Sequence, residues 1–131
     1  DKALSITKNL DVSKAIIATG FPFKKREMIP TFFACFEHLF NGITSARRCG
    51  SAALDLSYVA AGRFDAFFEY GLSPWDICAG VLLVEEAGGK TCDFNGSKNY
   101  FDHGNLIGGS KIMIDYMQPI IHQHFNKDIQ S

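Results

Sequence analysis

The chain has 131 residues, of which 47% are hydrophobic and 21% are charged, and its formal net charge is −1. This size and composition are typical of one globular domain with its own core. A charge near zero offers no electrostatic basis for binding nucleic acid or an anionic membrane surface, and no apolar run is long enough to span a bilayer. With no signal peptide in view, we expect a cytoplasmic protein without nucleic-acid or membrane partners.

Apolar periodicity predicts that strands and helices alternate along the chain. Short apolar or alternating runs, bounded by glycines and turns, predict strands at 15–19, 43–47, 64–69, 90–94 and 105–109. Helical spacing with start and stop signals predicts helices at 27–40, 51–61, 74–87 and 110–125. Pro119 is expected to kink the last helix. This order predicts an α/β fold with a mostly parallel sheet flanked by helices. We expect residues 1–14 to be a frayed N-terminal remnant and residues 15–131 to form the α/β domain.

Three of the expected strands lead into loops that could form a binding site, at 20–22, 47–52 and 69–76. In open α/β sheets, ligands bind beyond the carboxyl ends of the strands. If the three strands are parallel, these loops share one edge of the sheet. Two of the loops lead into helix N-termini, which present free backbone N–H groups to an anion or a polyol. The sequence therefore predicts a binding site at this edge.

Asp76 has two interpretations. Ser73 suits an N-cap and Pro74 the first helical position, so Asp76 can complete a capping box by reaching back to the Ser73 N–H. The carboxylate can also be a ligand for Mg²⁺, which prefers oxygen ligands and takes few of them from the protein. Glu69, on the same connection, can orient a substrate or remain a solvated carboxylate. Trp75 is expected to lie in the core or to form a wall beside Asp76.

Histidines and cysteines give weaker signals. His122 and His124 are two residues apart on one helix and face different directions, so a shared metal is not expected, and His38 has no partner that the sequence reveals. The four cysteines form no C-x-x-C pair, which gives little support for a zinc site. Cys35 and Cys78 lie in apolar helical segments, where we expect buried thiols.

Several segments resemble the inositol monophosphatase family. Residues 75–89 match the family pattern W-D-x-x-A-G-x-x-[LIV]-[LIV]-x-E-A-G-G, and ATGFPF, GSAALDL, DFNGSKNY and NLIGGS resemble other family segments. The resemblance implies the C-terminal α/β domain of the family's layered fold. It also implies Mg²⁺-dependent phosphomonoester hydrolysis without a covalent intermediate, and the GSAALDL version leans toward the monophosphatase branch.

The resemblance implies roles for individual residues as well. Asp76 would be a metal ligand, and Glu69 would bind a substrate hydroxyl group. The substrate pocket would be lined or shaped by residues of the second loop: Gly50, Ser51, Ala52 and Arg47. The substrate would be a small phosphorylated polyol or sugar, and the full-length protein would be a homodimer.

The chain departs from the family in one large respect. The other metal ligands of the family lie in G-E-[ES] and D-P-[ILV]-D-G-T motifs of an N-terminal half, and neither motif occurs in these residues. The resemblance therefore predicts the C-terminal half of a phosphatase, which would be inactive alone because one carboxylate holds Mg²⁺ poorly. The alternatives are a catalytically inactive α/β interaction module and a small-molecule binding module that uses the two helix N-termini.

Overall fold

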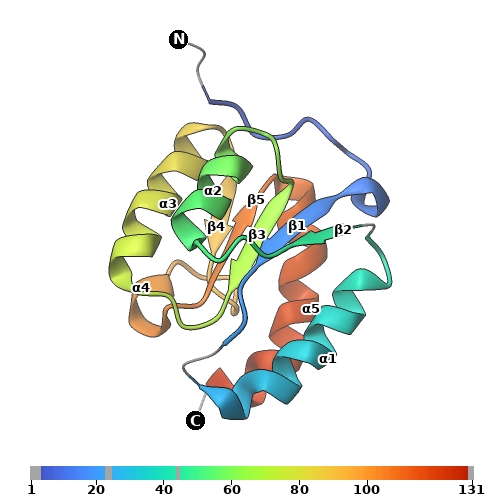
Figure 1. Cartoon of the computed structure of the whole chain (residues 1–131), viewed down its shortest axis with the longest axis vertical. Helices are drawn as coiled ribbons and strands as arrows, with labels where there is room; N and C mark the ends of the chain where they lie inside the picture. Colours follow the sequence, from blue (N-terminus) through green and yellow to red (C-terminus); the bar gives the residue numbers. More distant parts are fainter. Residues whose placement is uncertain (1–3, 23–24, 44, 130–131) are drawn as a thin grey trace.

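The computed structural model describes residues 4–22, 25–43 and 45–129, which form a sheet between two helical layers (Figure 1). Helices α2 and α3 cover one face of the sheet, and α1 and α5 cover the other. The described strands are β1 (Ile16–Thr19), β2 (Ser45–Arg47), β3 (Ala66–Glu69), β4 (Lys90–Cys92) and β5 (Leu106–Gly109). The described α-helices are α1 (Ile29–Phe40), α2 (Ala52–Ala60), α3 (Pro74–Glu86), α4 (Tyr100–His103) and α5 (Lys111–Ile129). Two short 3₁₀ turns precede β1 and α1, at Val12–Lys14 and Arg26–Met28.

The sheet is mixed, with strand order β2-β1-β3-β5-β4. Strand β1 pairs in parallel with β2 and β3, whereas β5 pairs antiparallel with β3 and β4. Four of the described strands therefore run in one direction and β5 runs against them. The expected α/β sheet flanked by helices is confirmed. The reversal of β5 follows from the connection after β4, which holds a tight turn and the one-turn helix α4 rather than a crossover helix.

Local signals in the sequence mark most element boundaries. The Ser51 hydroxyl accepts a hydrogen bond from the Leu54 N–H at 3.2 Å and caps α2, and Pro30 falls in the first turn of α1. Helix α5 extends four residues beyond the expected end at Phe125, and Pro119 lies inside it. The kink at Pro119 stays a prediction. Helix α4 was not predicted, because one helical turn is too short to show a periodicity.

The hydrophobic core lies on both faces of the sheet. In β3, Ala66 and Phe68 face the cluster under α1 and α5, and Phe67 faces the cluster under α2 and α3, as the alternation predicts. Phe64 was expected to share the face of Ala66 and Phe68. It lies in the α2/α3 cluster instead, because the strand begins only at Ala66 and the strict alternation does not extend back to Phe64.

Two expectations for α3 were wrong. Trp75, expected in the core or as a wall, is 80% exposed, and Cys78, expected to be a buried thiol, is exposed. The reason is that α3 carries apolar residues around most of its circumference, so the sequence does not reveal which stripe faces the sheet. The buried stripe consists of Ile77, Gly80 and Val84. Cys35 is buried, as expected, and burial raises the pKa of its thiol to about 12.

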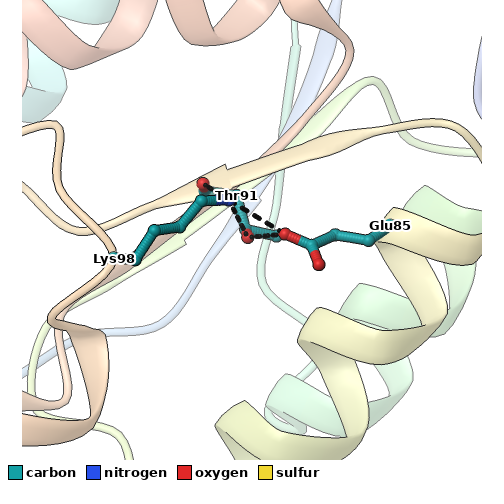
Figure 2. Close-up of polar contacts among 3 residues, drawn as sticks. All are labelled: Glu85, Thr91 and Lys98. Carbon is teal, nitrogen blue, oxygen red and sulfur yellow. Dashed lines mark hydrogen bonds and ion pairs between the residues drawn. The ribbon is translucent and has the colours of Figure 1, made fainter.

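The C-terminal end of α3 is tied to β4 by a small polar network (Figure 2). The Thr91 hydroxyl donates to Glu85 Oε2 at 2.7 Å, and Lys98 Nζ donates to the same oxygen at 2.9 Å and to the Thr91 carbonyl at 2.8 Å. The hydrogen bond from Thr91, followed by that from Lys98, lowers the pKa of Glu85. An exposed ion pair contributes little stability by itself. Its main effect here is to fix the helix end against the sheet.

Residues 4–14 run along the body of the domain. The Ile6 N–H donates to the Ala87 carbonyl at 3.1 Å, and Asn9 Nδ2 donates to Asp65 Oδ1 at 3.2 Å. The other oxygen of the buried Asp65 carboxylate accepts from the Ile16 N–H at 2.7 Å, which joins this segment to the start of β1. Residues 1–3 of the expected remnant lie outside the described residues, and the boundary at residue 14 stays a prediction. None of the described helices is long and apolar enough to cross a bilayer.

Candidate functional site

The three loops singled out in the sequence meet at one edge of the sheet. The register pairs Ala18 with Arg47 and Thr19 with Phe68 in parallel strands, so β2, β1 and β3 all end on the same side. Two adjoining cavities lie at this edge, of about 350 Å³ and about 110 Å³. Phe21 and Glu69 line both of them. The expectation that these loops share an edge is confirmed.

The larger cavity lies between the end of β3 and the start of α3. Its lining includes Glu69 at the end of β3 and Asp76 in the first turn of α3. The loop between them is held from below, because the Leu72 N–H donates to the Gly104 carbonyl at 2.7 Å and the Gly71 N–H donates to Asn105 Oδ1 at 3.1 Å. Gly104 has a φ of 75°, and a Cβ there would lie 2.4 Å from the Leu72 carbonyl oxygen. Only glycine suits this contact.

Asp76 both helps to begin α3 and lines the larger cavity. The Ser73 hydroxyl donates to Asp76 Oδ2 at 2.8 Å and accepts from the Asp76 N–H at 3.5 Å. Ser73 as the N-cap and Pro74 in the first turn are confirmed. The capping box differs from the expected form. The Asp76 carboxylate accepts a hydrogen bond from the Ser73 hydroxyl, whereas we expected it to accept from the Ser73 backbone N–H. A carboxylate at this position is also favoured by the positive end of the helix dipole.

Glu69 occupies space that a side chain at residue 20 would fill. A Cβ on Gly20 would lie 2.3 Å from Glu69 Oε1 and 2.6 Å from its Cδ. The missing side chain therefore lets the Glu69 carboxylate lie against the end of β1. Since Glu69 lines both cavities, this contact places its carboxylate at the point where they adjoin.

The smaller cavity lies at the start of α2. Gly50, Ser51 and Ala52 line it together, and their role in binding a substrate stays a prediction. Arg47 lines neither cavity, because its guanidinium turns back to donate to Ser45 Oγ and, at 2.9 Å, to the Ala46 carbonyl. The neighbouring Arg48 lines the cavity instead, with its guanidinium carbon 4.6 Å from the Phe21 ring centroid.

Asp55 is a lining residue that the sequence analysis missed. It is 1% exposed, lines the smaller cavity, and neither of its carboxylate oxygens has a hydrogen-bond partner of normal geometry among the described residues. Burial raises the pKa of Asp55, and the weak thiol donor of Cys49 opposes this shift. The same interaction raises the pKa of Cys49. The one sequence signal for Asp55 was its place between two leucines early in α2. This signal does not identify a site residue, because an acidic residue is equally common in the solvent-exposed first turns of a helix.

Two nitrogen-bearing side chains of the larger cavity were also missed. Lys25, which follows the β1 loop, and His103, which ends α4, both line it. Neither position has a local pattern that distinguishes it from solvent-exposed sequence. Lys25 places a positive group, and His103 an imidazole ring, in the same cavity as the carboxylates of Glu69 and Asp76.

The residues present fit a divalent cation in part. Asp76 and Glu69 supply the oxygen donors that Mg²⁺ prefers, and Mg²⁺ is often held by only one or two carboxylates together with substrate phosphate and water. Within the described part of the chain, no group of three or more histidine, cysteine, aspartate or glutamate side chains converges on one point. The described residues therefore offer some of the oxygen donors that a divalent cation would need, and not a full ligand set.

Comparison with known proteins agrees with the resemblance seen in the sequence. The sequence profile of the Inositol monophosphatase family matches residues 1–131. The protein named Nus factor SuhB from Pasteurella multocida is 43% identical, over 97% of this chain and 49% of the relative. The protein of the same name from Escherichia coli is 51% identical, over 82% of this chain and 40% of the relative. The chain thus spans about half the length of the curated relatives it matches.

Solved structures show the same relationship. The extragenic suppressor protein suhB from Bartonella henselae superposes with a TM-score of 0.87 at 34% identity, over 92% of this chain and 47% of the other. An inositol monophosphatase from Anabaena superposes with a TM-score of 0.84 at 37% identity, over 92% of this chain and 50% of the other. The fold, the profile match and the relatives agree that the chain belongs to the inositol monophosphatase family.

Proposed function

We propose that the chain supplies the substrate-side half of a Mg²⁺-dependent phosphomonoesterase that acts on a small phosphorylated polyol or sugar. The observation that carries this proposal is that Glu69 and Asp76 line one cavity, which adjoins at Glu69 the pocket formed by residues 50–52. A carboxylate for a cation, an acceptor for hydroxyl groups and a helix N-terminus for an anion or polyol are thereby gathered at one edge of the sheet.

Each residue has a defined task in this proposal. Asp76, held by Ser73, holds a divalent cation at the start of α3. When bound, the cation supplies positive charge for phosphoryl oxygens and an activated water. Glu69 accepts a hydrogen bond from a substrate hydroxyl and thereby orients the substrate. Residues 50–52 form the pocket wall, and Arg47, which bonds to the Ala46 carbonyl within β2, shapes only the start of the chain segment that leads to that wall.

The activity of the whole protein needs groups beyond this chain. The chain spans about half the length of its curated relatives, and the G-E-[ES] and D-P-[ILV]-D-G-T motifs do not occur in it. The 131-residue chain by itself should therefore release no phosphate. The full-length protein should hydrolyse the substrate, and a cytoplasmic homodimer remains the expected form.

The test is phosphate release from inositol 1-phosphate with millimolar Mg²⁺. The full-length protein should turn over, Asp76→Asn should abolish turnover, and the chain alone should be inactive. Asp115→Asn is the matched control, because Asp115 lies on α5 in an exposed pair with Lys111 and lines neither cavity of the site. Turnover by the full-length protein that survives Asp76→Asn would refute the metal role of Asp76.

The alternative is a catalytically inactive module that binds a protein or a small molecule. The name Nus factor SuhB, carried by several relatives, keeps this alternative open. A full-length protein that binds Mg²⁺ and inositol 1-phosphate without releasing phosphate would favour the binding module. No Mg²⁺-dependent binding and no turnover would favour the interaction module.

A further inference from the structure

The side chains of His38 on α1 and His124 on α5 meet where these two helices pack together. Nδ1 of His38 lies 2.9 Å from Nε2 of His124, and the ring centroids are 5.2 Å apart with the ring planes at 80°. Both side chains are half-buried. The sequence shows no partner for His38, because the two residues are 86 positions apart. His122, by contrast, bonds to Asn95 at 3.1 Å, so His122 and His124 do face different directions, as expected.

The two facing nitrogens can share one proton or bind one metal ion. When they share a proton, one N–H donates and the other nitrogen accepts through its lone pair. When each neutral ring instead carries its one proton on its other nitrogen, Nε2 of His38 and Nδ1 of His124, both facing nitrogens offer lone pairs to one small region. Neutral imidazole nitrogens are common ligands of zinc, copper and nickel. Burial, and then the neighbouring His38, lower the pKa of His124, which favours the neutral ring that a metal requires.

The distance between the two nitrogens indicates which coordination geometry fits. Metal–imidazole bonds are about 2.0–2.1 Å long, so a 2.9 Å separation corresponds to an N–metal–N angle of about 90°. A tetrahedral angle would require a separation of about 3.3 Å with the same bonds. A right angle between neighbouring ligands is typical of the square-planar and tetragonal sites of Cu(II) and Ni(II). Both rings must turn so that each lone pair points about 45° away from the line that joins the nitrogens, toward one ion beside it.

We propose that His38 and His124 form a two-histidine site for a divalent transition metal of the nickel and copper class, which ties α1 to α5. Within the described ranges no third histidine, cysteine, aspartate or glutamate converges on the pair, so water completes the coordination. The site is independent of the proposed Mg²⁺ site. Its donors are nitrogens on the α1/α5 side of the sheet, whereas Asp76 offers oxygens at the start of α3 on the other side.

The probe is Ni²⁺, because it does not oxidise thiols. The full-length protein is titrated in excess Mg²⁺, which occupies oxygen-rich sites, and in a Cys49→Ser/Cys78→Ser background that removes the two exposed thiols. Ni²⁺ should raise the Tm, and calorimetry should give one saturable site per chain. His38→Asn and His124→Gln should each weaken Ni²⁺ binding by at least about tenfold, because even the loss of a residue that only supports a ligand costs about 10–100-fold. His122→Gln is the matched control and should bind Ni²⁺ like the parent protein.

A second readout does not depend on how well the variants fold. In the NMR spectrum of the protein with labelled histidine rings, paramagnetic Ni²⁺ should broaden the His38 and His124 signals together, before those of His103 and His122. Broadening at other histidines first, or an equal Ni²⁺ affinity in His38→Asn and the parent, would overturn the proposal. Absence of any saturable binding would leave the pair as a shared-proton hydrogen bond and overturn it as well.

Discussion

Gly20→Ala should displace the Glu69 carboxylate without unfolding the domain. The new methyl group would lie 2.3 Å from Glu69 Oε1, whereas ordinary contacts begin at 3.4 Å, so the carboxylate must move by about 1 Å. The obstructing atoms are the end of a flexible side chain, which can give way at little cost. Fixing the backbone with alanine stabilises by about 0.4–1 kcal/mol where the conformation allows it, so the net change in the free energy of unfolding should be below about 1 kcal/mol.

The effect on catalysis should be much larger. A misplacement of about 1 Å at a positioning group can lower kcat/KM by about 100-fold, which corresponds to about 2.7 kcal/mol of transition-state stabilisation. The assay is steady-state hydrolysis of inositol 1-phosphate by the full-length protein, together with thermal unfolding of the same samples. Gly108→Ala is the matched control, because its methyl group would lie at an ordinary 3.5 Å from Leu56 Cδ2 and away from both cavities of the site.

A double-mutant cycle with Glu69→Ala identifies the cause. In that background there is no carboxylate to displace, so Gly20→Ala should have almost no further effect on kcat/KM. The reasoning is refuted if folded Gly20→Ala retains the wild-type kcat/KM. It is equally refuted if the substitution lowers kcat/KM as much without the Glu69 carboxylate as with it.

Three further substitutions test the packing and the buried charges. Asp55→Asn replaces a buried carboxylate, which faces only the weak thiol donor of Cys49, by an uncharged amide, so urea unfolding at pH 7 should show about 1–3 kcal/mol more stability. Because burial raises the pKa of Asp55, the ionised carboxylate destabilises the folded state above its folded-state pKa, and this cost disappears below the ordinary pKa of 3.8. The stability gained by Asp55→Asn should therefore shrink as the pH falls toward 4, and a loss of stability at pH 7 would contradict this. Gly80→Ala places a methyl group 2.2 Å from Leu56 Cδ1, and its overpacking cost of about 1–3 kcal/mol should exceed the helix-propensity gain of about 1 kcal/mol and lower the Tm. Ala79→Gly, at an exposed position of the same helix, measures the helix-propensity difference between alanine and glycine without the packing effect. A higher Tm for Gly80→Ala than for the parent would contradict close packing of α2 against α3. Asp93→Ala removes the carboxylate oxygen that accepts from the backbone N–H groups of Asn95 and Ser97, both at 2.9 Å, and should lower the free energy of unfolding by about 3 kcal/mol. Asp93→Asn should recover part of this loss, and equal stability of Asp93→Ala and the parent in urea would contradict the prediction.

Elements with strong local signals could be predicted from the sequence. The hydroxyls of Ser51 and Ser73 begin two helices, and glycine follows the ends of α2 and α3, because caps and turns depend on a few neighbouring residues. The direction of β5 could not be predicted, since it depends on which strand lies next to it. The exposure of Trp75 depends in the same way on which stripe of an all-round apolar helix faces the sheet.

In the candidate site too, some residues could be placed from the sequence and others could not. Glu69, Asp76 and the pocket at residues 50–52 could be placed at one edge because parallel strands bring their carboxyl ends together. Asp55 could not be placed there, because an acidic residue in the first turns of a helix is common in any protein. The contact between His38 and His124 joins helices whose residues are 86 positions apart in the sequence, and no local pattern predicts such a contact.

The reversal of β5 changes which connection can shape the larger cavity. In an all-parallel sheet, the segment before a strand lies at the edge away from the ligand. Since β5 runs against β3, Glu69 pairs with Leu106 and the start of β5 lies beside the end of β3. The segment just before β5 therefore supplies His103, Gly104 and Asn105 to the cavity and to the loop beneath it. Gly104 and Asn105 are needed to hold the loop, whereas His103 only lines the cavity. Substitution of His103 can therefore change the lining of the cavity while the strand pairing and the loop contacts stay intact, which makes this position a natural place to diversify or redesign specificity.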